Sequence, residues 1–168
     1  MSHPGAFLDR DGVLIEDSGY PHRDEDLKLI PGAAVAVRRL NAAGYRTVIV
    51  TNQSGVARGL FDEDRMHAFN ALLTARLASE GARIDAVYAC PFHADAVVER
   101  YRHPDHPDRK PNPGMILRAV VEHDIDPARS ILIGDRGSDM EAARRAGVEG
   151  LLFEGGDLDA FVQGRLRL

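Results

Sequence analysis

The chain has 168 residues, 44% hydrophobic and 28% charged, values that suit a globular protein with one domain over residues 1–168. Its net charge of −5 argues against a nucleic-acid partner and against binding to an anionic membrane surface, because both need an excess of lysine and arginine. No apolar stretch is long enough to cross a bilayer and no basic leader precedes one, so we expect a cytoplasmic protein.

A short apolar run near the start of the chain ends on Asp9 and predicts a buried strand whose last residue emerges at a sheet edge. Asp11 follows two positions later, so strand alternation predicts that both carboxylates face one way and Arg10 faces another. Two carboxylates this close repel each other, and a divalent cation is the usual compensation. Asp-x-Asp-Gly is also common turn chemistry, so the pair alone does not decide between a catalytic site and a turn.

Strands and helices are expected to alternate along the rest of the chain, after a polar, turn-rich loop over residues 16–30. The first half predicts a helix from Pro31 to Gly44, a strand over 45–51, a helix from its N-cap Asp62 to Gly81, and a strand over 84–90. The second half predicts an irregular connection over 91–112, a helix from its N-cap Asn112 to His123, a strand over 130–135, a helix capped by Ser138 with Glu141 and ended by Gly147, a strand over 150–153, and a helix capped by Asp157. This alternation predicts an α/β fold of three layers, a Rossmann-like parallel sheet with helices on both faces.

Sites in such folds form where the carboxyl ends of the strands meet, above all where the strand order reverses. If the first strand is central, its neighbours are the second and fourth strands, and the order is 3-2-1-4-5. That order gathers Asp9, Asp11, Thr51 and Asp135 around one crevice. Three carboxylates at one edge suit Mg²⁺, a hard cation that prefers oxygen ligands.

The chemistry that fits this crevice is phosphoryl transfer. Asp9 can accept a phosphoryl group, while Asp11 protonates the leaving oxygen and then activates a water molecule. Lys110 and Mg²⁺ would neutralise charge, and the Thr51 hydroxyl would hold phosphoryl oxygens. Arg109 could bind a second anionic group of the substrate. Each residue alone is an ordinary strand or surface residue, and their joint placement favours catalysis.

Several motifs carry a family resemblance. They are Asp9-x-Asp11-Gly12-Val13, Thr51-Asn52-Gln53-Ser54-Gly55, Arg109-Lys110-Pro111-x-Pro113-Gly114-Met115 and Gly134-Asp135-x-x-x-Asp139-Met140. Together they resemble the haloacid dehalogenase superfamily of phosphohydrolases, and more narrowly its branch of D,D-heptose 1,7-bisphosphate phosphatases and histidinol phosphatases. The resemblance covers about residues 6–146 and implies Mg²⁺-dependent hydrolysis of a phosphomonoester through an aspartyl-phosphate intermediate.

The resemblance also implies roles for individual residues. Asp9 is the nucleophile, Asp11 is the general acid and base, and Thr51 and Lys110 stabilise the phosphoryl group. The magnesium ligands that it implies are Asp9, the backbone carbonyl of Asp11, and Asp135, with Asp139 behind them. The substrate contacts that it implies are Asp17, Ser18, Gly19, Tyr20, Asn52, Gln53, Ser54, Arg109 and Arg136. Neither the first nor the third strand is followed by room for a cap domain, so we expect a capless, open site.

The connection before Arg109 departs from the pattern of the branch, which commonly binds a structural zinc through Cys-x-His and Cys-x-Cys. The candidate ligands in this chain are Cys90, His93, His103 and His106. Thiolate and imidazole both suit zinc, but the spacing differs from the pattern. A CysHis₃ zinc site and a metal-free loop shaped by prolines both remain open.

The substrate that the resemblance favours is D-glycero-D-manno-heptose 1,7-bisphosphate, because residues 54–59 and Arg109 match the heptose enzymes. Histidinol phosphate or another small sugar phosphate is the alternative. A hypothesis of another class is a non-catalytic phospho-acceptor module, in which a phosphorylated aspartate is a signal. Asp11 argues against that module, because a general base beside Asp9 would shorten the life of the phosphoaspartate. Oligomeric state is not constrained by the sequence.

Overall fold

A parallel sheet of five strands forms the centre of the molecule, in the order β3-β2-β1-β4-β5. The computed structural model describes residues 1–167. The strands are β1 (His3–Leu8), β2 (Arg46–Asn52), β3 (Ala86–Cys90), β4 (Ile125–Gly134) and β5 (Glu149–Leu152). The predicted α/β class and strand order are confirmed, and β1 lies between β2 and β4.

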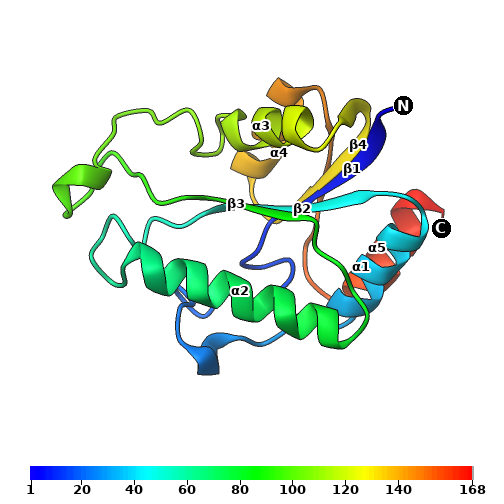
Figure 1. Cartoon of the computed structure of the whole chain (residues 1–168), viewed down its shortest axis with the longest axis horizontal. Helices are drawn as coiled ribbons and strands as arrows, with labels where there is room; N and C mark the ends of the chain where they lie inside the picture. The colour runs from blue at the N-terminus through cyan, green and yellow to red at the C-terminus, as the bar shows by residue number, and fades with distance from the viewer. Residues whose placement is uncertain (168) are drawn as a thin grey trace.

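Helices cover both faces of this sheet (Figure 1), with α1, α2 and α5 on one face and α3 and α4 on the other. The helices are α1 (Ala33–Ala42), α2 (Glu63–Ser79), α3 (Gly114–Glu122), α4 (Gly137–Ala146) and α5 (Leu158–Leu166). Within residues 1–167, the segment between β1 and α1 contains only the short 3-10 helix η1 (Asp24–Asp26), and the segment between β3 and α3 contains only η2 (Glu99–Tyr101), so neither holds a further domain. Over the same range, no helix combines the length and apolar character that crossing a membrane requires.

Alternate side chains of each central strand enter opposite halves of the hydrophobic core. Leu8 and Ile49 pack with α1, α2 and α5, whereas Phe7 and Val48 pack with α3 and α4. All four side chains are fully buried. Strands covered on both faces read as continuous apolar runs, which is why the sequence reveals them. This packing fixes β1, so that the residues after Leu8 emerge at its carboxyl end.

The N-terminus of α3 differs from the prediction. Pro113 occupies the N-cap position without a side-chain cap. The Asn112 side chain donates instead to Asp105 Oδ1 at 2.7 Å and to the His106 carbonyl at 3.0 Å. Asn112 therefore ties together the preceding loop and does not cap the helix.

The N-terminus of α4 also differs, because Ser138 and Glu141 do not form its capping box. Asp139 accepts the backbone N–H of the N-cap residue, Arg136, at 3.1 Å. Glu141 instead pairs with Arg144 on the helix surface. The caps predicted for α2 and α5 are confirmed, and β4 begins earlier than predicted.

Candidate active site

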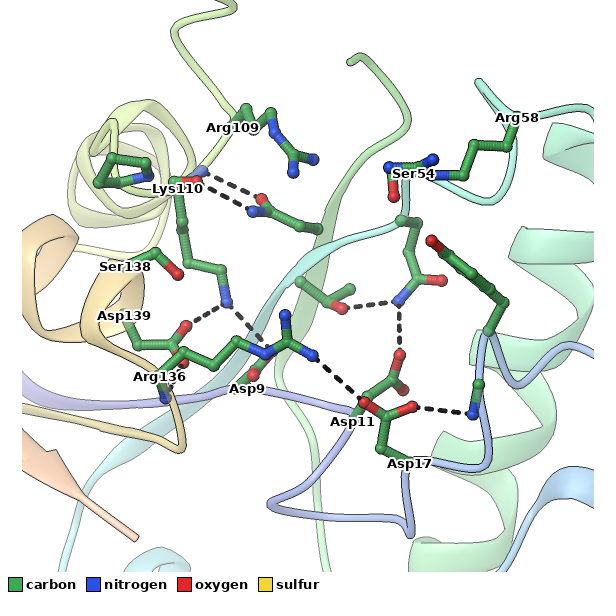
Figure 2. A pocket seen from close by; sticks show the side chains of 16 residues that line it. Asp9, Asp11, Asp17, Ser54, Arg58, Arg109, Lys110, Arg136, Ser138 and Asp139 are labelled. Atoms are coloured by element: carbon green, nitrogen blue, oxygen red, sulfur yellow. Dashed lines mark hydrogen bonds and ion pairs between the residues drawn. The ribbon is translucent and has the colours of Figure 1, made fainter. Parts of the chain in front are cut away.

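A cavity of about 560 Å³ opens at the carboxyl ends of β1 and β2, and Figure 2 shows the side chains that line it. The lining residues are Asp9, Asp11, Asp17, Gly19, Tyr20, Thr51, Asn52, Gln53, Ser54, Arg58, Arg109, Lys110, Pro111, Arg136, Ser138 and Asp139. Most residues that the sequence assigned to a site are brought together here. Ser18 and Asp135 do not line the cavity.

The ammonium group of Lys110 is buried between two carboxylates at the base of this cavity. Its Nζ lies 3.0 Å from Asp9 Oδ1, 2.6 Å from Asp139 Oδ1 and 2.9 Å from the Val50 carbonyl. Burial lowers the pKa of Lys110, but the two carboxylates outweigh burial and the net pKa lies above its ordinary value. The lysine therefore supplies a fixed positive charge beside Asp9.

Asp9 is buried and Asp135 is partly buried, and burial affects the pKa of both carboxyl groups. Burial raises the pKa of Asp9, against the opposing effect of Lys110, and burial also raises the pKa of Asp135. Asp135 Oδ1 is buried, and no donor within residues 1–167 reaches it. An ion bound by both carboxylates would offset the cost of burying them.

Oxygens of Asp9, Asp135 and Asp139 lie within 4.8 Å of one another, close enough to share a metal ion. Both oxygens of Asp139 are already engaged, one by Lys110 and the other by the backbone N–H groups of Asp135 and Arg136. Asp9 and Asp135 are therefore the side chains that suit Mg²⁺, and Asp139 holds the lysine behind them.

Gly12 allows Asp135 to approach the chain that leaves β1. Its φ of +88° lies in the left-handed region, and a Cβ atom there would be 2.1 Å from Asp135 Oδ2. Glycine is thus required both by the backbone conformation and by the position of the carboxylate.

Arg10 does not point away from Asp11, as strand alternation predicted. Its side chain is 1% exposed, and its Nε donates to Asp11 Oδ1 at 2.7 Å. The strand ends at Leu8, and the Arg10 carbonyl already accepts the N–H of Leu14 in a turn. The period-two rule therefore does not apply beyond Leu8.

The side chains of Asn52 and Gln53 are bound to other protein groups. Asn52 exchanges two hydrogen bonds of 3.0 Å with the backbone of Lys110. Gln53 Nε2 donates to Thr51 Oγ1 at 2.8 Å and to Asp11 Oδ2 at 3.4 Å. These amides, which the family resemblance assigns to substrate, thus also set the positions of Lys110, Thr51 and Asp11.

Three arginines, Arg58, Arg109 and Arg136, extend into the outer part of the cavity (Figure 2). Arg136 lies 3.5 Å from Asp17 Oδ2, and the Arg58 guanidinium carbon is 5.7 Å from the centre of the Tyr20 ring. One guanidinium group can donate two parallel hydrogen bonds to a phosphate. The rim of the cavity therefore suits an anionic group of the substrate in addition to the one bound at Lys110. Arg58 was missed as a site residue, although its segment, residues 54–59, was singled out for its resemblance to a substrate loop.

The four candidate zinc ligands do not form a metal cluster in the described residues. Cys90 Sγ and His106 Nδ1 are 4.0 Å apart, and the rings of His103 and His106 are 5.1 Å apart, but His93 Nε2 lies instead 3.5 Å from Arg58. Within residues 1–167, the aspartate group described above is the one set of three or more side chains close enough to hold an ion. Cys90 ends β3 and the three histidines lie in the loop that follows, and the four side chains do not converge on one point.

Protein contacts hold this loop in place. The His106 ring stacks on Phe92 with centres 4.1 Å apart, and its Nδ1 accepts the Asp108 N–H at 3.0 Å. Burial raises the pKa of the Cys90 thiol to about 11, so the thiol is protonated at neutral pH when no metal is bound.

Two family models match the chain on either side of this loop. The haloacid dehalogenase-like hydrolase model matches residues 6–71, and a HAD-hydrolase-like model matches residues 108–160. The first range contains Asp9, Asp11 and Thr51, and the second contains Lys110 and Asp135. The matches therefore cover both halves of the cavity.

Similar proteins include D-glycero-beta-D-manno-heptose-1,7-bisphosphate 7-phosphatase of Rhodopseudomonas palustris, 49% identical over 95% of this chain and 88% of that protein. D-glycero-D-manno-heptose-1,7-bisphosphate 7-phosphatase of Thermosynechococcus vestitus is 46% identical over 98% of this chain and 85% of that protein. The crystal structure of D,D-heptose 1,7-bisphosphate phosphatase from B. bronchiseptica, complexed with magnesium and phosphate, superposes with a TM-score of 0.81. It is 32% identical and covers 98% of each chain.

Proposed function

Because the chain belongs to the haloacid dehalogenase family of phosphatases, we propose that it removes the C7 phosphate of D-glycero-D-manno-heptose 1,7-bisphosphate. The observation that carries this proposal is the buried Lys110 between Asp9 and Asp139, at the base of a cavity rimmed by arginines. The lysine lies where a transferred phosphoryl group would need positive charge, and the arginines suit the second phosphate of a bisphosphate.

In this proposal Asp9 is the nucleophile. Its Oδ1 accepts hydrogen bonds from Lys110 Nζ at 3.0 Å and from the Arg10 N–H at 2.9 Å, which fixes the orientation of the carboxyl group. An Asp9 oxygen bonds to phosphorus while the bond to the sugar oxygen breaks, and Asp11 gives its proton to that oxygen. Asp11 then takes a proton from water as the aspartyl phosphate is hydrolysed and Asp9 is regenerated.

The residues of this chain fit Mg²⁺, because Asp135 Oδ1 is a buried carboxylate oxygen without a donor within residues 1–167 and lies close to Asp9. Asp9 and Asp135 would hold the ion together with the backbone carbonyl of Asp11. When bound, Mg²⁺ supplies positive charge that neutralises and orients the phosphoryl oxygens. Lys110, with its Nζ 3.0 Å from Asp9 Oδ1, supplies a second, fixed positive charge.

The proposed substrate is tested by measuring phosphate release from a panel of phosphate esters in the presence of excess Mg²⁺. Both anomers of the heptose bisphosphate belong in the panel, because similar proteins are named for the beta and for the alpha anomer. We expect a heptose bisphosphate to give the highest kcat/KM. A higher value for histidinol phosphate would overturn the substrate assignment.

The nucleophile is tested by Asp9→Asn, which keeps the shape of the side chain and removes its charge. We expect phosphate release to fall by at least about a thousandfold, with the circular dichroism spectrum unchanged. Full activity of this variant would show that another group attacks phosphorus. Turnover by the unmodified protein also argues against the phospho-acceptor alternative, in which the phosphoaspartate would persist.

A further inference from the structure

The side chain of Arg10 lies behind the cavity and does not line it, yet it binds the proposed acid and base directly. Its Nε is 2.7 Å from Asp11 Oδ1, and one terminal nitrogen is 3.3 Å from Asp11 Oδ2. A planar guanidinium that faces both oxygens fixes the plane of a carboxyl group as well as its distance. Asp11 is therefore held in one orientation.

Contacts from three separate segments immobilise the guanidinium itself. It donates to Asn70 Oδ1 on α2 at 2.8 Å, to Gln53 Oε1 after β2 at 3.0 Å, and to the Pro21 carbonyl at 2.9 Å. The Phe69 ring packs against it, 4.7 Å from its central carbon. Arg10 thus links α2 and the end of β2 to the Asp11 carboxyl group and fixes its position relative to them.

The Pro21 contact also connects Arg10 to the loop that lines the substrate cavity. Gly19 and Tyr20 of that loop face the cavity, and Pro21 follows them directly. One side chain therefore sets both the position of Asp11 and the anchor of the neighbouring loop. Burying a charged group is costly unless it is paired and hydrogen-bonded. The contacts described above satisfy the buried Arg10 guanidinium directly beside Asp11.

We propose that Arg10 is a positioning residue for proton transfer to the leaving group. This inference rests on the proposed phosphatase function. As an Asp9 oxygen bonds to phosphorus and the bond from phosphorus to the leaving oxygen breaks, the Asp11 proton passes to that oxygen. Arg10 keeps the Asp11 carboxyl group within reach of the departing oxygen, and its two N–H groups remain bound to the carboxylate that results.

The dependence of rate on the leaving group tests this role. A sugar alkoxide needs a proton as it leaves, whereas p-nitrophenolate leaves readily without one. In Arg10→Lys the charge is kept but the two-pronged contact is lost. We expect kcat/KM for the heptose bisphosphate to fall about 10- to 100-fold and kcat/KM for p-nitrophenyl phosphate to fall less than about threefold.

A second variant keeps the test informative if Arg10→Lys folds poorly. Asn70→Leu removes one acceptor of the guanidinium from the α2 side without touching Asp11. We expect kcat/KM to fall selectively for the heptose bisphosphate again, by a smaller factor than in Arg10→Lys. Arg39→Lys is the matched control, because Arg39 makes a two-pronged pair with Asp159 remote from the cavity, at 2.8 and 3.1 Å. Arg39→Lys should affect the two substrates equally.

Equal losses on both substrates in the Arg10 and Asn70 variants would overturn the positioning role and indicate a purely structural arginine. An unchanged kcat/KM on both substrates would overturn it as well. Failure of the proposed function is distinguished from either result, because the unmodified protein would then release no phosphate from any member of the panel.

Discussion

Gly12 and Asp135 lie so close together that the position of one restricts the identity of the other. Gly12 has a left-handed backbone, and its missing side chain leaves the space that Asp135 Oδ2 occupies. The metal-binding carboxylate of the proposal therefore depends on a residue that has no functional group. Gly12 thus affects the site through its backbone conformation and through the space that it leaves.

Gly12→Ala should weaken the response to Mg²⁺. A Cβ atom 2.1 Å from Asp135 Oδ2 displaces this carboxylate from its present position, so the Mg²⁺ concentration for half-maximal activity should rise at least about tenfold. Activity measured over a Mg²⁺ titration, together with calorimetric titration of Mg²⁺, checks this expectation. The same Mg²⁺ dependence as the unmodified protein would contradict it.

Gly44→Ala is the control for backbone strain. Gly44 has the same φ of +88°, and nothing lies within 4 Å of the place its Cβ would take. Both variants should lose about 1 to 3 kcal/mol of folding free energy through left-handed strain. Only Gly12→Ala should change the Mg²⁺ titration.

At the scale of elements, α1 and α5 are joined on one face of the sheet by an ion pair. Arg39 on α1 contacts both oxygens of Asp159 on α5. The hydrogen bond from Arg39 lowers the pKa of Asp159, with Gln163 acting in the same direction. The ionised carboxylate is thus stabilised in the folded state.

Asp159→Asn should lower the melting temperature at pH 7 by about 2–4 °C, because the neutral amide loses the charge-assisted pair. A lowered pKa contributes stability above the pKa of the unfolded chain, about 4, and the contribution disappears as the pH falls through the folded pKa. The difference in melting temperature between Asp159→Asn and the unmodified protein should therefore shrink below pH 4. Thermal melts from pH 7 down to pH 2 measure it.

Glu141→Gln is the control for this pH series. Glu141 pairs with Arg144 and Arg145 on the surface of one helix, where solvent screens the charges. Its melting temperature should match that of the unmodified protein. A difference for Asp159→Asn that persisted at the same size at pH 2 would show that shape, and not charge, joins α1 to α5.

The loop between β3 and α3 should be stable without zinc. His106→Ala removes the stack on Phe92 and should cost about 1 kcal/mol of unfolding free energy, measured by urea denaturation. Added Zn²⁺ should leave the melting temperature of the unmodified protein unchanged. One tightly bound zinc per chain by elemental analysis would contradict this expectation, and His67→Ala, on the exposed side of α2, is the matched control.

Over the whole molecule, the strand order and the main site could be predicted because the signals are local. Buried strands such as Thr47–Val50 read as apolar runs, and the carboxylates that follow β1 and β4 mark their carboxyl ends. If the first strand is central, its neighbours are the second and fourth strands, and this condition predicts Asp9 beside Asp135. The parallel topology then brought Thr51 to the same edge.

What could not be predicted depends on contacts between distant segments. The direction of Arg10 is set by Asn70, 60 positions away, and no local period contains that information. The bonds of Asn52 to the Lys110 backbone likewise span the loop before α3. Family resemblance assigned Asn52 to substrate because motifs record which residues recur, and not which atoms they bind.

The central place of β1 in the sheet has a consequence for synthesis on the ribosome. β2 covers one edge of β1, but the other edge is covered only by β4, Ile125–Gly134. At ordinary elongation rates the interval between these strands lasts on the order of ten seconds. During that time one edge of β1 exposes unpaired backbone N–H and C=O groups between apolar side chains, so chaperone binding and cotranslational aggregation should centre on β1.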